Sequence, residues 1–514
     1  MPKSCPSMTL NHSLDPARTP VIVGVGEIAD RPAHLENSLE PAALIAEALR
    51  RADRDTGGST LLPFVDSLDV VNSVTCRYDD LPSRVSVLSS ISPRRAIHGA
   101  LGGESPVRLL HEAAMRIAEG LSETAIICGA EASYARYHAE RTGVNLPWPP
   151  ADNSWYDLLA RHSHPHAVAL GVAQPSTVYP FFENALQAAL GQTPSEGRRR
   201  SAELWSEYAE IALQNPCSWI RRPVSADEIA STSVANRMIA WPYPKLMMAN
   251  PTVNQGAAVL ITSLARARQL GVPAKRMVFF WSGASAVDPR DYLLRDQFVR
   301  SPAMEAVLNE CTRAVESAGQ KIGAMELYSC FPCVPKMVQQ ALHFADQHAP
   351  SVTGGLTFFG APLNNYMTHA ACEMVRRLRD GSVDSGLLYG QGEFVTKHHA
   401  LVLGTKSPPD FELCGDHSVQ ADADARRGPS PGLYIGAGDS AKIETHTVLF
   451  ERDQSVRHGI VIVRVQSGER AIARISKESQ AALDLLTSPD ESPIGKLGQI
   501  QRASDGLYEW SFAR

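Results

Sequence analysis

The chain has 514 residues, 44 % of them hydrophobic and 20 % charged, which is enough for about three domains of ~150 residues. Its net charge of −6 gives no reason to propose nucleic-acid binding, and no apolar run reaches the ~18 residues of a membrane-spanning helix. The nine cysteines are scattered and no secretory signal is recognisable, so we expect reduced thiols and a cytoplasmic protein.

Strands and helices alternate from residue 20 to about residue 135, after a lead of residues 1–19 that we expect to be disordered. The apolar stretch Val21–Gly24 predicts the first strand, and Pro41–Ala52 and Val107–Glu119 predict helices. Strands that alternate with helices indicate a mostly parallel sheet covered by helices.

Residues 136 to about 240 interrupt this alternation and are rich in Pro, Trp, His and Arg. Amphipathic helices are predicted at Phe181–Leu190 and Ser201–Gln214, so this region is expected to be an insertion. Three histidines alternate at His162, His164 and His166, but in a polar loop between prolines we do not expect them to bind a metal.

The alternating pattern resumes at about residue 250 and continues to residue 406. A Pro-rich, polar linker follows at 407–432, and residues 433–514 then change to β patterning with one short helix. The order of three strands, a helix and further strands predicts a small barrel similar to an OB-fold.

Two segments of the chain look like copies of one structural unit, Gly103–Ala132 and Asn364–Glu393. In both, a glycine-rich loop leads into an apolar-periodic helix, which stops at a glycine and is followed by a short strand ending in Gly129 or Gly390. This repeat predicts a duplicated α/β domain whose two helix N-termini face one another across a shared site.

Three further motifs accompany the repeat, and together they resemble the thiolase superfamily. The sequence at Tyr328–Phe331 (YSCF) stands where sterol-carrier-type thiolases have His-Asp-Cys-Phe. Gly354-Gly355 with Gly360-Ala361-Pro362 resembles the GG…GHP loop, and NPTVNQGAAVLITS at 250–263 is similar to a GNxSxxxDGAAA strand.

The resemblance implies a duplicated thiolase fold, with two βαβαβαββ halves in five layers, α-β-α-β-α. The N-terminal half would span 20–285, with a loop domain at about 136–240, and the C-terminal half would span 286–406. The block at 433–514 resembles the additional C-terminal domain of type 1 thiolase-like proteins, and also the OB domain of the DUF35 partners of thiolase-like enzymes.

The residues that carry thiolase chemistry are missing. By alignment to the family pattern, Gly103 takes the place of the nucleophilic cysteine and Ala361 that of the GHP histidine. The second cysteine corresponds to Tyr389 or Gly390, and the Asn or His that binds the thioester oxygen corresponds to Tyr328. Without a thiolate to hold the acyl group, a cysteine acyl-enzyme is not expected.

We therefore expect a protein that binds or acts on an acyl-CoA or related thioester, in the acyltransferase class by resemblance. One alternative is a retro-aldol C–C lyase with Tyr328 as general base, and another is a non-catalytic acyl-CoA binding or scaffold protein. Coenzyme A would enter as part of the substrate with no further cofactor and no metal. The protein would bind neither nucleic acid nor membrane, and it would be a monomer or homodimer.

The candidate site residues follow from the same positions. Tyr328 can serve as acid, base or oxyanion donor once its pKa is tuned, or it merely fills the space left by the missing residue. Ser105, followed by Pro106, is interpreted as a helix N-cap rather than a nucleophile. The expected catalytic residues are Tyr328 and His369, and the expected substrate-binding residues are Gly103, Ser105, Tyr366 and Gly390.

Overall fold

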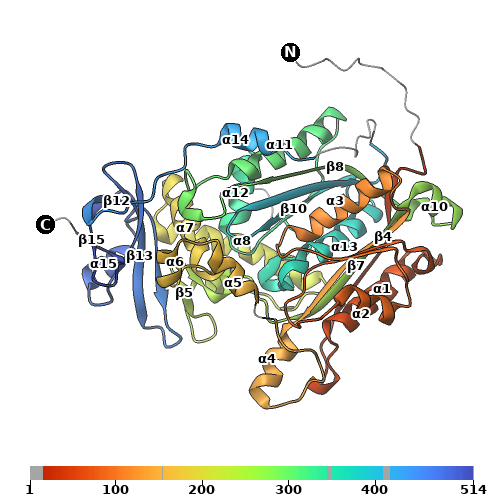
Figure 1. Ribbon diagram of the computed structural model, residues 1–514, viewed down its shortest axis with the longest axis horizontal. Helices are drawn as coiled ribbons and strands as arrows, with labels where there is room; N and C mark the ends of the chain where they lie inside the picture. The colour runs from red at the N-terminus through yellow and green to blue at the C-terminus, as the bar shows by residue number, and fades with distance from the viewer. Residues whose placement is uncertain (1–14, 153, 344–349, 409–416, 513–514) are drawn as a thin grey trace.

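The computed structural model describes residues 15–152, 154–343, 350–408 and 417–512 (Figure 1). Most of the predicted lead at residues 1–19 lies outside them. The first half of the duplication supplies five strands: β1 (Pro20–Ala29), β2 (Ser67–Val70), β3 (Arg95–His98), β4 (Thr124–Ala132) and β7 (Asn254–Ser263). The second half supplies four: β8 (Val278–Val287), β9 (Ala324–Leu327), β10 (Ser385–Gly392) and β11 (Lys397–Gly404).

These nine strands follow one another in the order β3-β2-β4-β7-β1-β8-β11-β10-β9. The two halves join only at two residue pairs, Val21 with Phe279 and Ile22 with Val278, where β1 meets β8. This narrow junction lets the two halves of the sheet lie on opposite sides of a central pair of helices.

The central helices are α3 (Ser105–Ala118) and α13 (Tyr366–Arg379), the two copies predicted from the repeat. Both contact strands of each half, and each is buried on most of its surface because it has sheet on both sides. The helices α1 (Pro41–Asp55) and α2 (Leu81–Ser89) cover the first half, and α11 (Pro302–Ser317) and α12 (Cys333–Ala341) cover the second. The predicted five-layered thiolase-type arrangement is confirmed.

The inserted region is mostly helical and packs between the central fold and the C-terminal barrel. Its elements are α4 (Ser133–Thr142), α5 (Ser154–Arg161), α6 (Pro165–Ala169), α7 (Pro175–Ala189), α8 (Pro194–Gln214), α9 (Ala226–Ala230), β5 (Met238–Ala240) and β6 (Tyr243–Pro244). Helix α8 begins with a capping box, in which Thr193 and Glu196 each accept a hydrogen bond from the other's backbone N–H. Helix α7 contacts α12 on one side and strand β12 of the barrel on the other.

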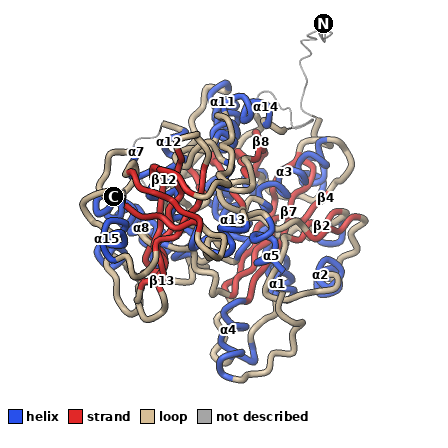
Figure 2. The backbone as a smooth tube through the Cα atoms, turned by 60° about the vertical axis from the view of Figure 1, so that its left-hand side comes forward, coloured by secondary structure: helices blue, strands red, loops and turns tan. Residues whose placement is uncertain are grey.

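The C-terminal residues form a closed five-stranded barrel, as predicted (Figure 2). Its elements are β12 (Gly438–Phe450), β13 (Val456–Val465), β14 (Arg470–Ile475), α15 (Gln480–Leu486), β15 (Leu497–Arg502) and β16 (Tyr508–Phe512). β12 pairs with both β13 and β15, and β14 pairs with β16, so the sheet closes on itself. Its interior holds Val461, Val463, Ile475 and Trp510 among other apolar side chains.

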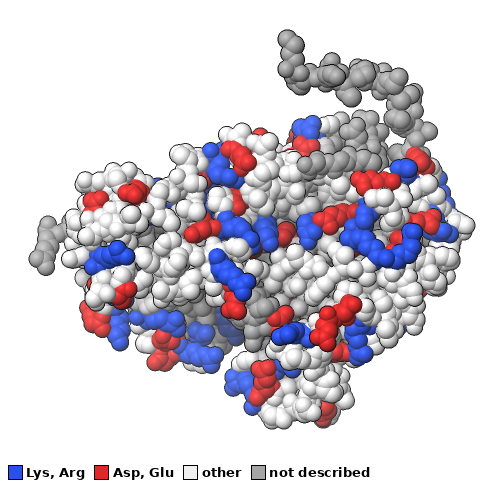
Figure 3. Space-filling view, viewed as in Figure 1, with Lys and Arg blue, Asp and Glu red and all other residues white. Residues whose placement is uncertain are grey.

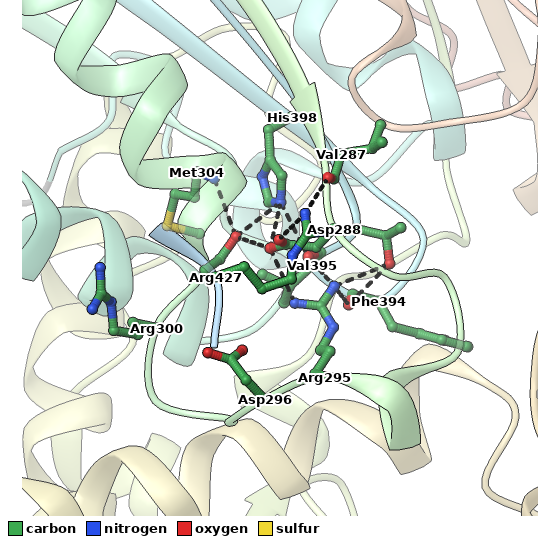
Figure 4. A network of polar contacts seen from close by, with 12 residues as sticks. Val287, Asp288, Arg295, Asp296, Arg300, Met304, Phe394, Val395, His398 and Arg427 are labelled. Atoms are coloured by element: carbon green, nitrogen blue, oxygen red, sulfur yellow. Dashed lines mark hydrogen bonds and ion pairs between the residues drawn. The ribbon is translucent and has the colours of Figure 1, made fainter. Parts of the chain in front are cut away.

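Polar contacts attach the barrel and the segment before it to the second half, and Figure 4 shows those of the segment before it. Within the predicted linker, α14 (Gln420–Arg426) packs on α11, and Arg427 forms an ion pair with Asp288. The side chain of Arg295 contacts Asp288 and donates to the carbonyl oxygens of the turn after β10. From the barrel, the fully buried Arg470 donates to the carbonyl oxygen of Leu293 at 2.7 Å.

The remaining elements are short. They are α10 (Leu264–Gln269), 3-10 turns at Leu35–Asn37, Leu62–Phe64, Lys245–Met247, Ala274–Arg276, Tyr292–Leu294 and Leu363–Asn365, and a π-helical turn at Gly355–Phe359. None of the helices in the described ranges combines the length and apolar character needed to cross a membrane.

Candidate functional site

The loops that precede α3 and α13 lie against each other. The backbone N–H of Gly102 donates to the side-chain oxygen of Asn364 at 3.0 Å, and the amide of Asn364 donates to the carbonyl oxygen of Asn72 at 3.1 Å. The two helix starts predicted from the repeat are therefore brought together, and the candidate site lies where they meet.

Gly103 is covered by the side chain of Tyr328. A Cβ atom added at Gly103 would lie 2.5 Å from the carbonyl oxygen of Gln391, 2.6 Å from Cζ of Tyr328 and still closer to the Tyr328 hydroxyl. Real Cβ atoms essentially never approach other atoms this closely. The tyrosine hydroxyl thus occupies the space that a side chain at position 103 would need.

Tyr328 is held in this position from both sides. It directly follows β9, and its backbone N–H donates to the carbonyl oxygen of Tyr389 at 3.0 Å. Its ring meets the ring of Tyr366 edge to face, with centroids 6.0 Å apart. Burial raises the pKa of Tyr328 well above its usual range, so the phenol is protonated at neutral pH and can donate a hydrogen bond.

Glu104 is a site residue that the sequence did not reveal. The residue is only 6 % exposed, and its Oε2 has no hydrogen-bond partner among the described residues. The carboxyl lies so close to Gly102 and Gly392 that a Cβ on either would collide with it. Burial raises the pKa of Glu104. An acidic residue at a helix start is ordinary in sequence, and only the tertiary structure shows that this one is buried beside Gly103.

The side-chain amide of Gln391 links the site to α7. The amide of Gln391 donates to the hydroxyl of Tyr179 at 2.6 Å and to the sulfur of Cys330 at 3.3 Å. Burial raises the pKa of Cys330 to about 12, so this thiol is neutral and poorly nucleophilic. Cys330 and Cys333 are both buried free thiols.

Tyr366 and His369 are both fully buried and bonded to other groups. The hydroxyl of Tyr366 donates to Glu326 at 2.6 Å, and burial raises the pKa of Glu326 to about 7. His369 contacts Glu27 on β1 through Nδ1 at 2.6 Å, while its Nε2 has no partner among the described residues. Tyr366 borders Tyr328 directly, whereas the ring of His369 contacts the ring of Phe359.

The remaining predicted positions have mixed outcomes. Ser105 is the first residue of α3 and Glu104 takes the cap position, so the N-cap interpretation of Ser105 was wrong. The Ser105 hydroxyl is buried without a partner among the described residues. Gly390 faces Glu104, since an added Cβ would lie 2.9 Å from the Glu104 Cα. Ala361 donates its N–H to the carbonyl oxygen of Asn250.

Of the two residues considered for the second cysteine position, only Gly390 faces the site. The neighbouring Tyr389 directs its hydroxyl to Nδ1 of His398 at 2.7 Å, and His398 belongs to the network around Asp288 (Figure 4). Successive residues of a strand point to opposite faces, which explains the difference.

The other sequence features lie apart from this site. Nδ1 of His164 accepts the backbone N–H of His166 at 3.2 Å, and within the described ranges no group of His, Cys, Asp or Glu is arranged to hold a metal ion. Among the exposed arginines, Arg199 pairs with Glu203 and Arg222 pairs with Glu228.

Comparisons with known proteins agree with this architecture. A family model described as the thiolase-like protein type 1 additional C-terminal domain matches residues 422–505. No curated protein sequence matches the chain. A monomeric SCP2-thiolase like protein type 1 from Mycobacterium smegmatis is 28 % identical, with a TM-score of 0.81 over 97 % of this chain and 100 % of the other.

Two more distant structures share the fold. The Ltp2-ChsH2(DUF35) aldolase is 19 % identical, with a TM-score of 0.57 over 75 % of this chain and 98 % of the other. The acetyl-CoA acetyltransferase from Syntrophomonas wolfei is 13 % identical, with a TM-score of 0.53 over 76 % of this chain and 100 % of the other. The family match of the C-terminal domain, the duplicated fold and the barrel support the expected resemblance of this chain to a thiolase-like protein type 1.

Proposed function

We propose that the protein binds an acyl-CoA or related thioester where α3 and α13 meet, and that no cysteine acyl-enzyme forms there. The observation that carries this proposal is the position of Tyr328, whose hydroxyl fills the space required by a side chain at Gly103. A nucleophile cannot occupy the same volume. Acyl transfer of the thiolase kind is therefore replaced by chemistry that uses the oxygen groups of a phenol and a carboxyl.

Tyr328 and Glu104 are the two groups suited to a thioester at this place. The protonated phenol of Tyr328 would donate a hydrogen bond to the thioester oxygen, where negative charge develops when a carbanion forms next to the carbonyl. The buried carboxyl of Glu104, with its unpartnered Oε2, is able to take or give a proton. Neither role requires a metal or a further cofactor, and coenzyme A would be part of the substrate.

Retro-aldol cleavage is the reaction that this pair favours. Glu104 in its ionised form would accept the proton of a β-hydroxyl group, and the Cβ oxygen would become a carbonyl as the Cα–Cβ bond breaks. The electron pair of that bond passes to the thioester enolate, which Tyr328 stabilises and which is then protonated at Cα. With its raised pKa, Tyr328 suits hydrogen-bond donation better than the role of general base first expected for it. The aldolase among the structures with this fold is compatible with the proposal.

The same proposal covers the state of the protein in solution. We propose a monomer, because the similar protein from Mycobacterium smegmatis is monomeric and the similarity to it covers 97 % of this chain, the additional barrel included. A cytoplasmic location stays a prediction from the sequence.

Direct binding measurements test the thioester site. Calorimetric titration would use acetyl-CoA and, separately, an acetyl thioester of N-acetylcysteamine, which lacks the nucleotide of coenzyme A. We expect both to bind, and Tyr328→Phe to weaken both by about tenfold through loss of one hydrogen bond in a buried site. Tyr137→Phe, on the outer helix α4, is the matched control and should change neither. A folded protein that binds neither thioester would refute the proposal.

A product assay separates a lyase from a binding protein. The wild type would be incubated with a 3-hydroxyacyl thioester, and the shortened thioester and the released carbonyl compound would be measured. We expect product, with loss of at least a hundredfold in rate for Glu104→Gln because general acid–base catalysis is worth about that much. Binding without any product from wild type would instead establish the non-catalytic alternative.

A further inference from the structure

A groove lies where the barrel meets the inserted region, separate from the site at Gly103. Its volume is about 610 Å³, within the roughly 300–1,000 Å³ of small-molecule sites. It is lined by Thr177 from the first turn of α7, by Arg237 just before β5 and Ile239 within it, and by the β12–β13 turn. Figure 3 shows charged side chains gathered along the lower edge of the molecule, where Figure 1 places β5 and the end of β13.

Two arginines in this groove lack an acidic partner. Arg237, just before β5, and Arg452 in the β12–β13 turn make no ion pair and no side-chain hydrogen bond to any residue that the structure describes. The third arginine, Arg457, is bound to Glu451 through Nε at 2.6 Å and through Nη2 at 3.3 Å. Two guanidinium groups from different domains thus face one groove with their donors available.

The acidic side chains of the groove are already engaged. Both oxygens of Glu451 are bound to Arg457. One oxygen of Asp453 accepts the backbone N–H of Ser455 at 3.0 Å and its hydroxyl at 2.6 Å, which turns the carboxylate back onto its own loop. The acids therefore leave the donors of Arg237 and Arg452 open to an anion from solution.

We infer that this groove binds a phosphorylated nucleotide. Guanidinium groups match the oxygens of a phosphate through paired hydrogen bonds, so Arg237 and Arg452 suit a phosphate or diphosphate. The partly exposed apolar side chains of Ile239 and Phe450 offer a surface on which a planar base can lie. Phosphate groups and a base together fit the groove better than a bare phosphate ion, which would leave most of its volume empty.

The nucleotide can come from two sources, a free adenine nucleotide or the phosphorylated end of a coenzyme A thioester. Helix α7 connects the groove with the candidate site, since Thr177 lines the groove and Tyr179, two residues later, is bonded to Gln391 beside Gly103. The groove itself is assigned from its own residues and does not depend on the proposed thioester function.

Titration of the full-length protein with four probes tests the inference: ADP, 3′-phosphoadenosine 5′-phosphate, adenosine and coenzyme A. We expect ADP and the bisphosphate to bind, adenosine to bind at least tenfold more weakly, and binding to weaken as salt is raised. Arg237→Ala and Arg452→Ala should each weaken binding of the two phosphorylated probes about tenfold. Arg200→Ala, an exposed arginine of α8 paired with Glu203, is the control and should have no effect.

The outcomes are distinct. A loss of coenzyme A binding in Arg237→Ala and Arg452→Ala, equal to the loss for the bisphosphate, identifies the groove as the site of the coenzyme's nucleotide end. Unchanged coenzyme A binding with weakened ADP binding identifies a separate nucleotide site. Failure of ADP and the bisphosphate to bind the folded protein, or equal binding by both variants, overturns the inference. The nucleotide-free thioester of N-acetylcysteamine reports on the Tyr328 site independently.

Discussion

Adding a methyl group at Gly103 is the most direct test of how the site is filled. The new Cβ would lie 2.5 Å from the carbonyl oxygen of Gln391 and 2.6 Å from Cζ of Tyr328. Gln391 lies in β10, which pairs with β9 on one side and β11 on the other, so its carbonyl cannot move without distorting the sheet. The side chain of Tyr328 is therefore the neighbour that can move.

The expected cost follows from overpacking. Inserting one carbon into a well-packed core costs about 1–3 kcal/mol, and here two neighbours are approached at once, so we expect Gly103→Ala to cost about 2–3 kcal/mol. Gly103→Cys, which restores the thiol type of the family, should cost at least as much and should not create thiolase activity. Tyr328→Phe removes the closest atom, so Gly103→Ala should cost less in that background. The remaining cost would come from the close contacts of the new Cβ with Cζ of residue 328 and with the carbonyl oxygen of Gln391.

Urea unfolding followed by near-ultraviolet circular dichroism measures these costs. Gly432→Ala is the control, because a Cβ there would meet its nearest neighbour, the flexible side chain of Glu469, only at 3.4 Å. It should change the free energy of unfolding by less than about 0.5 kcal/mol. If Gly103→Ala also falls within about 0.5 kcal/mol of the wild type, the hydroxyl of Tyr328 does not occupy the space at position 103, and the argument against a cysteine-type nucleophile fails.

Three other measurements follow from the structure. Burial raises the pKa of Glu104, so the wild type should lose stability as pH rises through that pKa, and Glu104→Gln should remove this loss. Arg470→Met should cost about 2–5 kcal/mol because it leaves the buried carbonyl oxygens of Leu293 and Arg295 without their donor, whereas Glu444 keeps its ion pair with Arg464. Arg474→Met on the same strand should cost about 0–1 kcal/mol; equal costs would contradict the attachment of the barrel. Burial lowers the pKa of His446 to about 4, so its stabilising contribution should be lost as pH falls from about 6.5 to 4, and His446→Gln should flatten that slope.

The fold was largely predictable because it depends on patterns that the chain carries locally. The repeat of glycine-rich loop, helix and strand predicted α3 with β4 and α13 with β10, and the alternation after residue 433 predicted the barrel. These elements bury apolar faces whose periodicity is written in neighbouring residues. The absence of a cysteine at position 103 could likewise be read directly from the sequence.

The candidate site required the tertiary structure, because its residues are distant in sequence and ordinary in type. Glu104 gives no signal in the chain, and its raised pKa arises only from burial between Gly102 and Gly392. The histidine expected near the site, His369, is instead bonded to Glu27 on another strand.

By itself, the sequence determined the duplicated architecture, the additional barrel and the presence of a glycine at position 103. Only the tertiary structure decided that Tyr328 takes the vacant space beside Gly103, and that Arg237 and Arg452 from two domains share one groove. The physical reason is the range of the interactions. Periodic burial is encoded over a few residues, whereas the pKa and contacts of a side chain depend on whatever the folded chain places around it.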